Sequence, residues 1–441
     1  MLQSIKIFGL FGRFDYEISF SEHDVLIITG PNGYGKSTIL RIIDSFCNEG
    51  LERVLGYPYT QLRILSDDKE LRIEKMDNAV KINDYKVPYN DAYLNGMEDV
   101  SAITGHRWPE IFSLNGINQN NHSIIREFIT SEESAERNFV QLVFYSTYLS
   151  KDVRTTKIKQ AVDGILELVD AFRNSIGKVR FIQEQRLIER REIQESERRQ
   201  RVRTEYVTAI KENSEKLKIE LSEIMKRHSE LSSNLDGTYI ERLFAADPVE
   251  HVSEEMFSRL EELQLKQEKL KLYGLAGIQS ASYLSNLDKN KLDRFGTELS
   301  IYLRDANEKY QVFEPIIEKL NLYEKIVNEK LGFKKMQLSS TDGISVVTDE
   351  NVKLSLTDLS SGEQEILVLF YKLIFESDAS LLLIDEPEIS LHIAWQKELM
   401  ENIKSVVKLK KNIRVIIATH SPQILSNNWD LQIDLGGQHN G

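Results

Sequence analysis

Residues 1–30 alternate between hydrophobic and polar positions, which is typical of β-strands that bury one face. A continuous hydrophobic run, Val25–Ile28, then stops just before Gly30, as a strand in the middle of a sheet would. The pattern next predicts a helix from Ser37 to about Phe46. Beyond it, short strands are expected over 60–90 and helices over 121–175.

Hydrophobic residues in the middle of the chain recur every three or four positions, which predicts amphipathic helices. The helical pattern follows a short strand at Val179–Ile182 and is interrupted around Asp236-Gly237 and Asp247-Pro248. Two helices packed as a protruding coiled-coil hairpin fit this spacing, and so does an ordinary helical bundle. More helix is expected from about Leu287 to Leu331.

The last part of the chain alternates strands and helices. Strands are predicted over 335–338, 344–347, 352–354, 380–385, 413–418 and 431–435, and helices over 362–376 and 391–408. We therefore predict an α/β head that is split by a helical insertion. In this division 1–185 forms the N-terminal part of the head, 186–331 the insertion and 332–441 the C-terminal part.

Length and composition narrow the class of protein. The 441 residues are enough for roughly two or three domains, and the net charge of −13 argues against nonspecific binding of nucleic acid over the whole surface. The single cysteine, Cys47, excludes an internal disulfide and fits a reducing compartment. The sequence shows no secretory signal and no hydrophobic run long enough to cross a membrane, so we expect a cytoplasmic protein without a membrane partner.

The densest positive run in the sequence is interleaved with glutamates. It comprises Arg186, Arg190, Arg191, Arg198, Arg199, Arg201 and Arg203, with Glu189, Glu192, Glu195 and Glu197 among them. This mixture is typical of a helix surface laced with ion pairs, and a local patch that binds nucleic acid also fits it.

The candidate chemistry begins with the motif Gly30-Pro31-Asn32-Gly33-Tyr34-Gly35-Lys36-Ser37, between a predicted strand and a predicted helix. A glycine-rich loop in this context directs backbone N–H groups at phosphates, and the helix N-terminus adds a positive partial charge. Lys36 can reach the β- and γ-phosphates of ATP, and the Ser37 hydroxyl can coordinate Mg²⁺. The same loop is expected to bind the nucleotide through Asn32, Gly33, Gly35 and Thr38 as well.

Two acids follow the hydrophobic run Leu381–Ile384, where a strand is predicted to end. Asp385 is expected to hold Mg²⁺, directly or through water. Glu386 is expected to act as the general base that polarises the attacking water. Together with the phosphate loop, this pair predicts hydrolysis of ATP.

Two further segments offer groups for a γ-phosphate. Ser360 and the backbone at Gly362 open a predicted helix, whose first N–H groups can bind an anion, although a plain N-cap would also explain the serine. His420 follows the predicted strand 413–418 and is expected to contact the γ-phosphate or the attacking water.

The order of these elements resembles the ABC-type ATPase heads of the SMC and OLD group. The resemblance implies an α/β, ABC-type P-loop ATPase head with an inserted helical or coiled-coil hairpin. It also implies that Ser360 and Gly362 close over ATP bound to another protomer, in a homodimer or a higher oligomer. Segments 359–364, 385–395 and 418–425 are most similar to the ATPase subunits of two-component anti-phage systems such as PARIS and Septu. His392 departs from the transporter-type pattern, which has aspartate there.

The family also has a glutamine that links the γ-phosphate and Mg²⁺ to the insertion. Gln185, in the segment Phe181–Leu187, resembles this residue most, and Gln119 is its rival. Arg13 resembles a basic residue that some members place near the phosphates, and a surface role fits it equally well.

The resemblance implies a sensor and scaffold switch that controls a separate effector in anti-phage defence. OLD-type nucleases continue into a nuclease domain, and the sequence after His420 has no room for one, so we expect the nuclease to be a partner chain. The trigger would be nucleic acid or a phage protein. The alternatives are a DNA-maintenance ATPase of the SMC or RecF kind and a structural module that oligomerises on ATP without turnover.

Overall fold

The computed structural model describes residues 1–20, 23–77, 79–88, 155–184, 186–195, 201–248, 252–275, 295–376 and 378–439. Its contacts divide the chain into two compact units. The first unit comprises Met1–Glu184, Ser377–Glu388 and Lys410–Gly441, and the second comprises Gln185–Glu376 and Ile389–Leu409. The domain limits at 185 and 331 stay a prediction.

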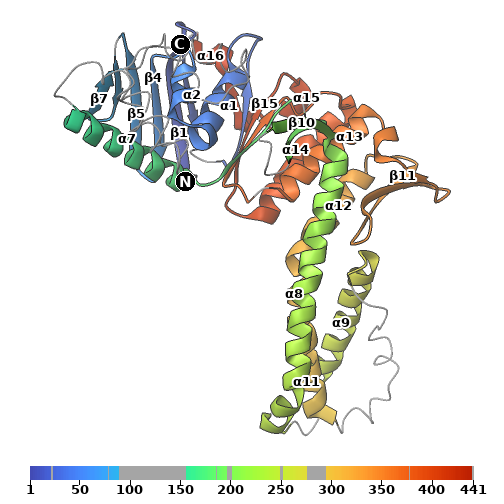
Figure 1. The fold of residues 1–441 in the computed structure, drawn as a ribbon. Coiled ribbons are helices and arrows are strands. Elements are labelled where there is room, and N and C mark those ends of the chain that lie inside the picture. Colours follow the sequence, from blue (N-terminus) through green and yellow to red (C-terminus); the bar gives the residue numbers. More distant parts are fainter. Residues whose placement is uncertain are drawn as a thin grey trace. The chain divides into compact units, whose positions relative to one another are not determined.

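Over the described residues, the first unit contains a six-stranded antiparallel sheet in the order β2-β1-β4-β5-β6-β7. Its strands are β1 (Leu2–Leu10), β2 (Phe14–Ser19), β4 (Gln61–Ser66), β5 (Lys69–Met76), β6 (Ala79–Ile82) and β7 (Tyr85–Pro88). Helix α7 (Thr155–Ile176) packs against β4 and β7 (Figure 1). The strands predicted over 1–30 and 60–90 are confirmed, and so is a helix in the described part of 121–175.

The described part of the first unit also contains a five-stranded parallel sheet in the order β16-β3-β15-β14-β8. Its strands are β3 (Val25–Thr29), β8 (Val179–Ile182), β14 (Leu381–Asp385), β15 (Arg414–Ala418) and β16 (Gln432–Asp434). Every residue of β3 and β14 is buried, as their continuous hydrophobic runs predict. Because the strands are parallel, the carboxyl ends of β3, β14 and β15 lie at one edge of the sheet, which confirms the predicted α/β head.

Helix α1 (Lys36–Asp44) follows β3 and packs against β8, β14 and β15. Its buried face, with Ile39, Leu40 and Ile42 at most 1% exposed, belongs to one hydrophobic core with residues of both sheets. A π-helical turn (Ser45–Glu49) and α2 (Leu51–Gly56) continue the chain. This packing fixes the start of α1 at the edge where the parallel strands end.

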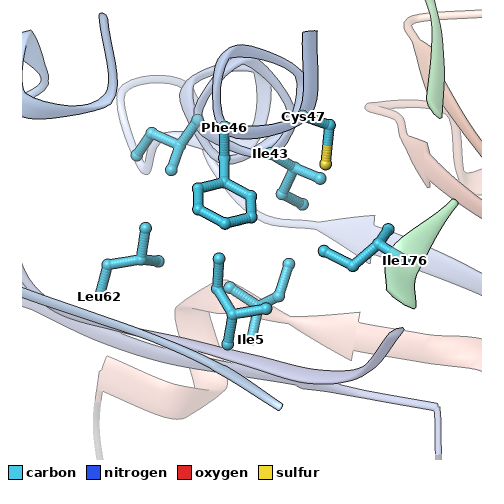
Figure 2. Close-up of a pocket in the computed structure, with 8 residues that line it drawn as sticks. Ile5, Ile43, Phe46, Cys47, Leu62 and Ile176 are labelled. Carbon is cyan, nitrogen blue, oxygen red and sulfur yellow. The ribbon is translucent and has the colours of Figure 1, made fainter. Parts of the chain in front are cut away.

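A small cavity of about 10 Å³ interrupts this core beside the π-helical turn. Figure 2 shows it among Ile5, Ile43, Phe46, Cys47 and Ile176, together with Leu62. The lining is apolar and the space is too small for a bound ligand. Burial raises the pKa of Cys47 to about 12, so the thiol stays protonated and unreactive.

The second unit is mainly helical over its described residues. Its helices are α8 (Ala209–Ala245), α9 (Glu254–Leu272), α11 (Gly296–Gln311), α12 (Glu314–Asn328), α13 (Ser361–Ile374) and α14 (Ile393–Lys410). The antiparallel strands β11 (Lys334–Ser339), β12 (Gly343–Thr348) and β13 (Lys353–Leu354) form a small sheet. These elements confirm the strands predicted over 335–338, 344–347 and 352–354 and the helices predicted over 362–376 and 391–408. The strands predicted over 380–385, 413–418 and 431–435 are β14, β15 and β16 of the first unit.

Helix α11 packs against both α8 and α9 (Figure 1). Leu260 and Leu263 of α9 pack on Leu299 and Leu303 of α11, and Arg242 of α8 pairs with Asp305 of α11. A third helix therefore shares the packing of α8 and α9, as the helical-bundle alternative allows. The inserted coiled coil itself stays a prediction.

The prediction of a helix surface was wrong for the described residues of the arginine-rich run, and Glu197, Arg198 and Arg199 lie outside them. Residues Ile188–Glu195 and Arg201–Thr208 form an antiparallel hairpin, β9 and β10. The sequence of β10 alternates Val202, Thr204 and Tyr206 with charged residues, which is the period of a strand. Cross-strand pairing therefore outweighs the helical ion pairs that the charge pattern permits.

The predicted interruption at Asp236-Gly237 was also wrong, because α8 continues through both residues to Ala245. A glycine inside a helix costs about 1 kcal/mol relative to alanine. Tertiary contacts offset this cost: Lys309 of α11 donates to Asp236 at 2.8 Å, and Arg242 of α8 pairs with Asp305. The interruption at Asp247-Pro248 is confirmed. None of the helices in the described ranges is long and apolar enough to cross a membrane.

Candidate nucleotide site

The phosphate loop lies between β3 and α1, as predicted, and its glycines adopt positive φ angles. Gly35 caps α1 with φ 89°, and the N–H of Ile39 donates to its carbonyl at 2.8 Å. A Cβ on Gly35 would lie 2.8 Å from Cδ2 of Leu10. Only glycine satisfies both conditions, so the loop backbone is held at the N-terminus of α1. Asn32 and Gly33 are exposed, and Ser37 and Thr38 are half-buried.

Lys36 is the cation of the site, and its side chain is only 5% exposed. Its Nζ donates to the carbonyl of Gly30 at 3.0 Å and contacts the ring of His420. Burial lowers the pKa of Lys36, and the carboxyls of Glu386 and Asp385 act against that shift. A polyphosphate bound at the loop would stabilise the buried positive charge of the Lys36 ammonium.

The Ser37 hydroxyl donates to Oδ1 of Asp385 at 2.9 Å. Asp385 ends β14 and is 3% exposed. Burial raises its pKa, and the hydrogen bond from Ser37 acts against that shift. A hydroxyl oxygen beside a carboxylate oxygen fits Mg²⁺, which takes one or two protein oxygens and fills its octahedron with water and phosphate. No group of three His, Cys, Asp or Glu side chains converges on a metal site within the described chain, so the fit depends on those additional ligands.

Glu386 begins the turn after β14 with a positive φ of 45°. Its N–H donates to the carbonyl of Ala418 at 2.9 Å, which ties this turn to the end of β15. Burial, followed by the charge of Glu388, raises the pKa of Glu386 to about 7. Such a carboxyl can take up a proton near neutral pH, as a general base must.

His420 lies directly beyond β15 and faces Glu386. Its Nε2 lies 3.2 Å from Oε1 of Glu386, and its side chain is 38% exposed. Burial and the neighbouring Lys36 ammonium lower the pKa of His420. The structure thus brings Lys36, Ser37, Asp385, Glu386 and His420 together in the first unit.

Ser360 and Gly362 lie in the second unit, at the start of α13. The Ser360 hydroxyl accepts from the N–H of Glu363, whose carboxylate accepts from the N–H of Ser360 at 2.8 Å, so they form a capping box. A Cβ on Gly362 would lie 2.7 Å from the carbonyl of Ser390, so close packing also requires a glycine here. The N-cap alternative thus describes how Ser360 is held within its own chain.

Lys334 of β11 supports the same helix start. Its Nζ donates to both carboxylate oxygens of Glu363, at 2.8 and 2.9 Å. Burial acts against ionisation of Glu363, but Lys334 and Ser360 together lower its pKa. Glu363 therefore stays ionised and keeps Ser360 in one orientation.

Four further residues singled out in the sequence are not seen to join this site: two lie outside the described residues, and two have local contacts. Gln185 and Gln119 lie outside the described residues. The guanidinium of Arg13 lies over the ring of Phe14, at 5.4 Å from the ring centre. His392 accepts from the N–H of Ala394 at 3.3 Å, which is a local role at the start of α14.

Sequence reasoning missed a role for Glu388. This carboxyl is 9% exposed and accepts from the Thr419 hydroxyl and from the N–H groups of His420 and Ser421. The signal in the sequence is the Glu386-Pro387-Glu388 spacing, since a second glutamate so close to a buried acid needs a partner.

Comparisons with known proteins indicate the family of the chain. The family model for the AAA ATPase domain matches residues 1–425. The Retron Ec83 probable ATPase of Escherichia coli is 30% identical over 131 residues, which are 24% of this chain and 24% of that protein. The chain thus matches about a quarter of that relative's length.

Solved structures of SMC heads are also similar to the chain. One is the Smc head domain with an extended coiled coil, bound to the C-terminal domain of ScpA, derived from Pyrococcus furiosus (13% identity, 97% of this chain and 91% of that chain, TM-score 0.35). Another is the SMC head domain from Thermotoga maritima (11% identity, 97% and 91%, TM-score 0.34). At these TM-scores the likeness adds nothing to the argument from the sheet and the phosphate loop.

The family match covers almost the whole chain and includes the phosphate loop, the acid pair and His420. The chain belongs to the AAA ATPase domain family.

Proposed function

We propose that the chain binds Mg²⁺-ATP at the edge of the parallel sheet and hydrolyses it. The observation that carries this proposal is the 2.9 Å hydrogen bond from Ser37 to Asp385, which joins the phosphate loop to the acid at the end of β14. Around that bond, a buried amine, a carboxyl of raised pKa and an imidazole converge. This set suits transfer of a phosphoryl group to water.

Each side chain has a distinct role in this mechanism. The amides at the start of α1 and the amine of Lys36 bind the β- and γ-phosphates and stabilise the charge that develops on them. Ser37 and Asp385 would hold Mg²⁺, which would polarise the phosphate oxygens. Glu386 takes the proton of the attacking water, and His420, 3.2 Å away, orients that water and the γ-phosphate.

We further propose that the complete site contains Ser360 and Gly362 of a second protomer. The ABC-type resemblance motivates this arrangement. The capping box holds the Ser360 hydroxyl at the start of α13, where helix amides favour an anion. ATP would then join two protomers, and hydrolysis would release them.

The biological role that fits is an ATP-driven switch that controls a separate effector, such as a nuclease, in anti-phage defence. The sequence similarity to a retron ATPase supports this role, and the resemblance to PARIS and Septu subunits motivates it. A ligand can shift such a switch only as far as it binds one state better than the other, so ATP must favour the joined state.

The experiment that tests this proposal is the solution mass of Glu386→Gln with and without Mg²⁺-ATP. We expect a mass near the chain's 51.0 kDa without nucleotide and twice that mass with it. The product of the neighbouring gene, co-expressed, should elute with only one of the two states. A mass that ATP does not change would contradict the two-protomer site.

A further inference from the structure

One carboxyl oxygen of Glu388 accepts hydrogen bonds from three consecutive residues of the loop after β15. Its Oε1 accepts from the Thr419 hydroxyl at 2.5 Å, from the N–H of His420 at 2.8 Å and from the N–H of Ser421 at 3.0 Å. Hydrogen bonds to an ionised acceptor are stronger than neutral ones, and burial protects these from water. The backbone on both sides of the His420 side chain is therefore held by one carboxylate.

The flanking residues of the loop are fixed independently. Thr419 is fully buried, and its N–H donates to the carbonyl of Ile28 on β3 at 3.1 Å. Ser421 is 8% exposed and caps the short helix that follows, since its hydroxyl accepts from the N–H of Gln423 at 3.2 Å. His420 alone projects outward, toward Lys36 and Glu386.

We propose that Glu388 is a positioning residue for ATP hydrolysis, which holds the His420 backbone so that the imidazole meets the γ-phosphate. This inference rests on the proposed function. Glu388 does not touch the reacting atoms in this account. Its carboxyl holds the His420 backbone, and its charge also acts on the neighbouring Glu386. A loop that loses the carboxylate leaves the Thr419 hydroxyl and the His420 N–H without this acceptor, whereas the Ser421 N–H keeps its bond to the Thr419 hydroxyl oxygen at 2.9 Å.

The alternative is that Glu388 only stabilises the fold, and a set of variants separates the two. Glu388→Ala removes the acceptor, whereas Glu388→Gln keeps an oxygen in the same place. Glu401→Ala is the matched control, because Glu401 is exposed and pairs with Lys404 on its own helix, α14. Each is made in the full chain and measured for ATP turnover and for hydrogen exchange at the His420 and Ser421 amides.

We expect Glu388→Ala to lower kcat about 10-fold or more, because a small misplacement of a catalytic group has large effects, while KM stays nearly constant. Glu388→Gln should recover most of the turnover. The His420 amide should exchange faster in Glu388→Ala alone, and the Ser421 amide should change less, because it keeps the Thr419 hydroxyl oxygen as an acceptor. In a His420→Ala background, Glu388→Ala should lower kcat by a smaller factor than in the wild type, since both changes remove the interaction that passes through His420.

The proposal is overturned if Glu388→Ala keeps wild-type turnover with protected amides, or if its loss adds fully to that of His420→Ala. Hydrogen exchange also separates this inference from the proposed function. If the wild-type chain shows no turnover that depends on Lys36, the proposed function fails. Unchanged amide exchange in Glu388→Ala would show that the carboxylate does not hold the loop, whatever the turnover.

Discussion

The Nε2 of His420 lies 3.2 Å from Oε1 of Glu386. The two residues are 34 positions apart in the sequence and meet because β14 and β15 are adjacent and parallel, with Asp385 opposite Ala418. The N–H of Glu386 donates to the carbonyl of that alanine. The geometry of this pair is therefore set by the sheet.

Replacing Lys36 with methionine tests the role of the buried amine. We expect the affinity for ATP to fall at least about 100-fold, because the phosphates lose their charged partner. The melting temperature without nucleotide should not fall, since burial already disfavours the ammonium. Calorimetric titration and thermal melts measure both, with Lys404→Met as an exposed control. An unchanged affinity of Lys36→Met for ATP would show that Lys36 does not bind the phosphates.

Asp385→Asn tests the assignment of Mg²⁺. The variant should bind ATP without metal as the wild type does, but added Mg²⁺ should no longer strengthen binding, and hydrolysis should drop about 100-fold or more. The measurement is turnover and affinity over a range of Mg²⁺ concentrations. Asp378→Asn is the control, because Asp378 is 87% exposed just before the same strand. An identical Mg²⁺ dependence in Asp385→Asn would refute the metal site.

Mixed protomers test whether one site draws on two chains. Lys36→Met and Ser360→Arg should each be inactive alone. Mixed in equal amounts, they should recover roughly a quarter of wild-type turnover, because half of the symmetric dimers pair unlike chains and each of those has one intact site. If the mixture stays inactive although both variants bind each other, Ser360 does not act across protomers.

The buried ion pair of the second unit predicts a stability effect. Nε of Arg186 lies 2.5 Å from Oε2 of Glu365 on α13, and the two side chains are 1% and 5% exposed. Glu365→Ala should destabilise this unit by about 3–5 kcal/mol, because it leaves a buried charge, whereas the double change Arg186→Met with Glu365→Met should be nearly neutral.

Urea unfolding followed by far-ultraviolet circular dichroism measures the effect of these changes, because most of the described helices belong to the second unit. Lys353→Ala, which breaks an exposed pair with Asp342, provides the control. Equal losses in the single and double variants would contradict the assignment.

Much of the first unit could be predicted because its signals are local. The hydrophobic runs of β3 and β14 are buried throughout, and glycines and acids mark where those strands end. The phosphate loop carries its own conformational requirement at Gly35. The residues expected to bind ATP and Mg²⁺ could therefore be named individually from the sequence.

The errors arose where local signals are ambiguous. Interleaved Arg and Glu residues suit both a helix and a strand, and only pairing with β10 decides the conformation of β9. The continuation of α8 through Gly237 depends on contacts with α11, which lies about sixty residues further along the chain. The contact of Glu388 with Thr419 likewise depends on which strand lies beside β14.

The most direct test of the central claim is phosphate release from ATP by Glu386→Gln. The account predicts that this variant binds Mg²⁺-ATP as tightly as the wild type. Its rate of phosphate release should be at least about 100-fold lower, because the general base is lost. Glu401→Gln, an exposed control, should match the wild type. Wild-type phosphate release by Glu386→Gln would contradict the account.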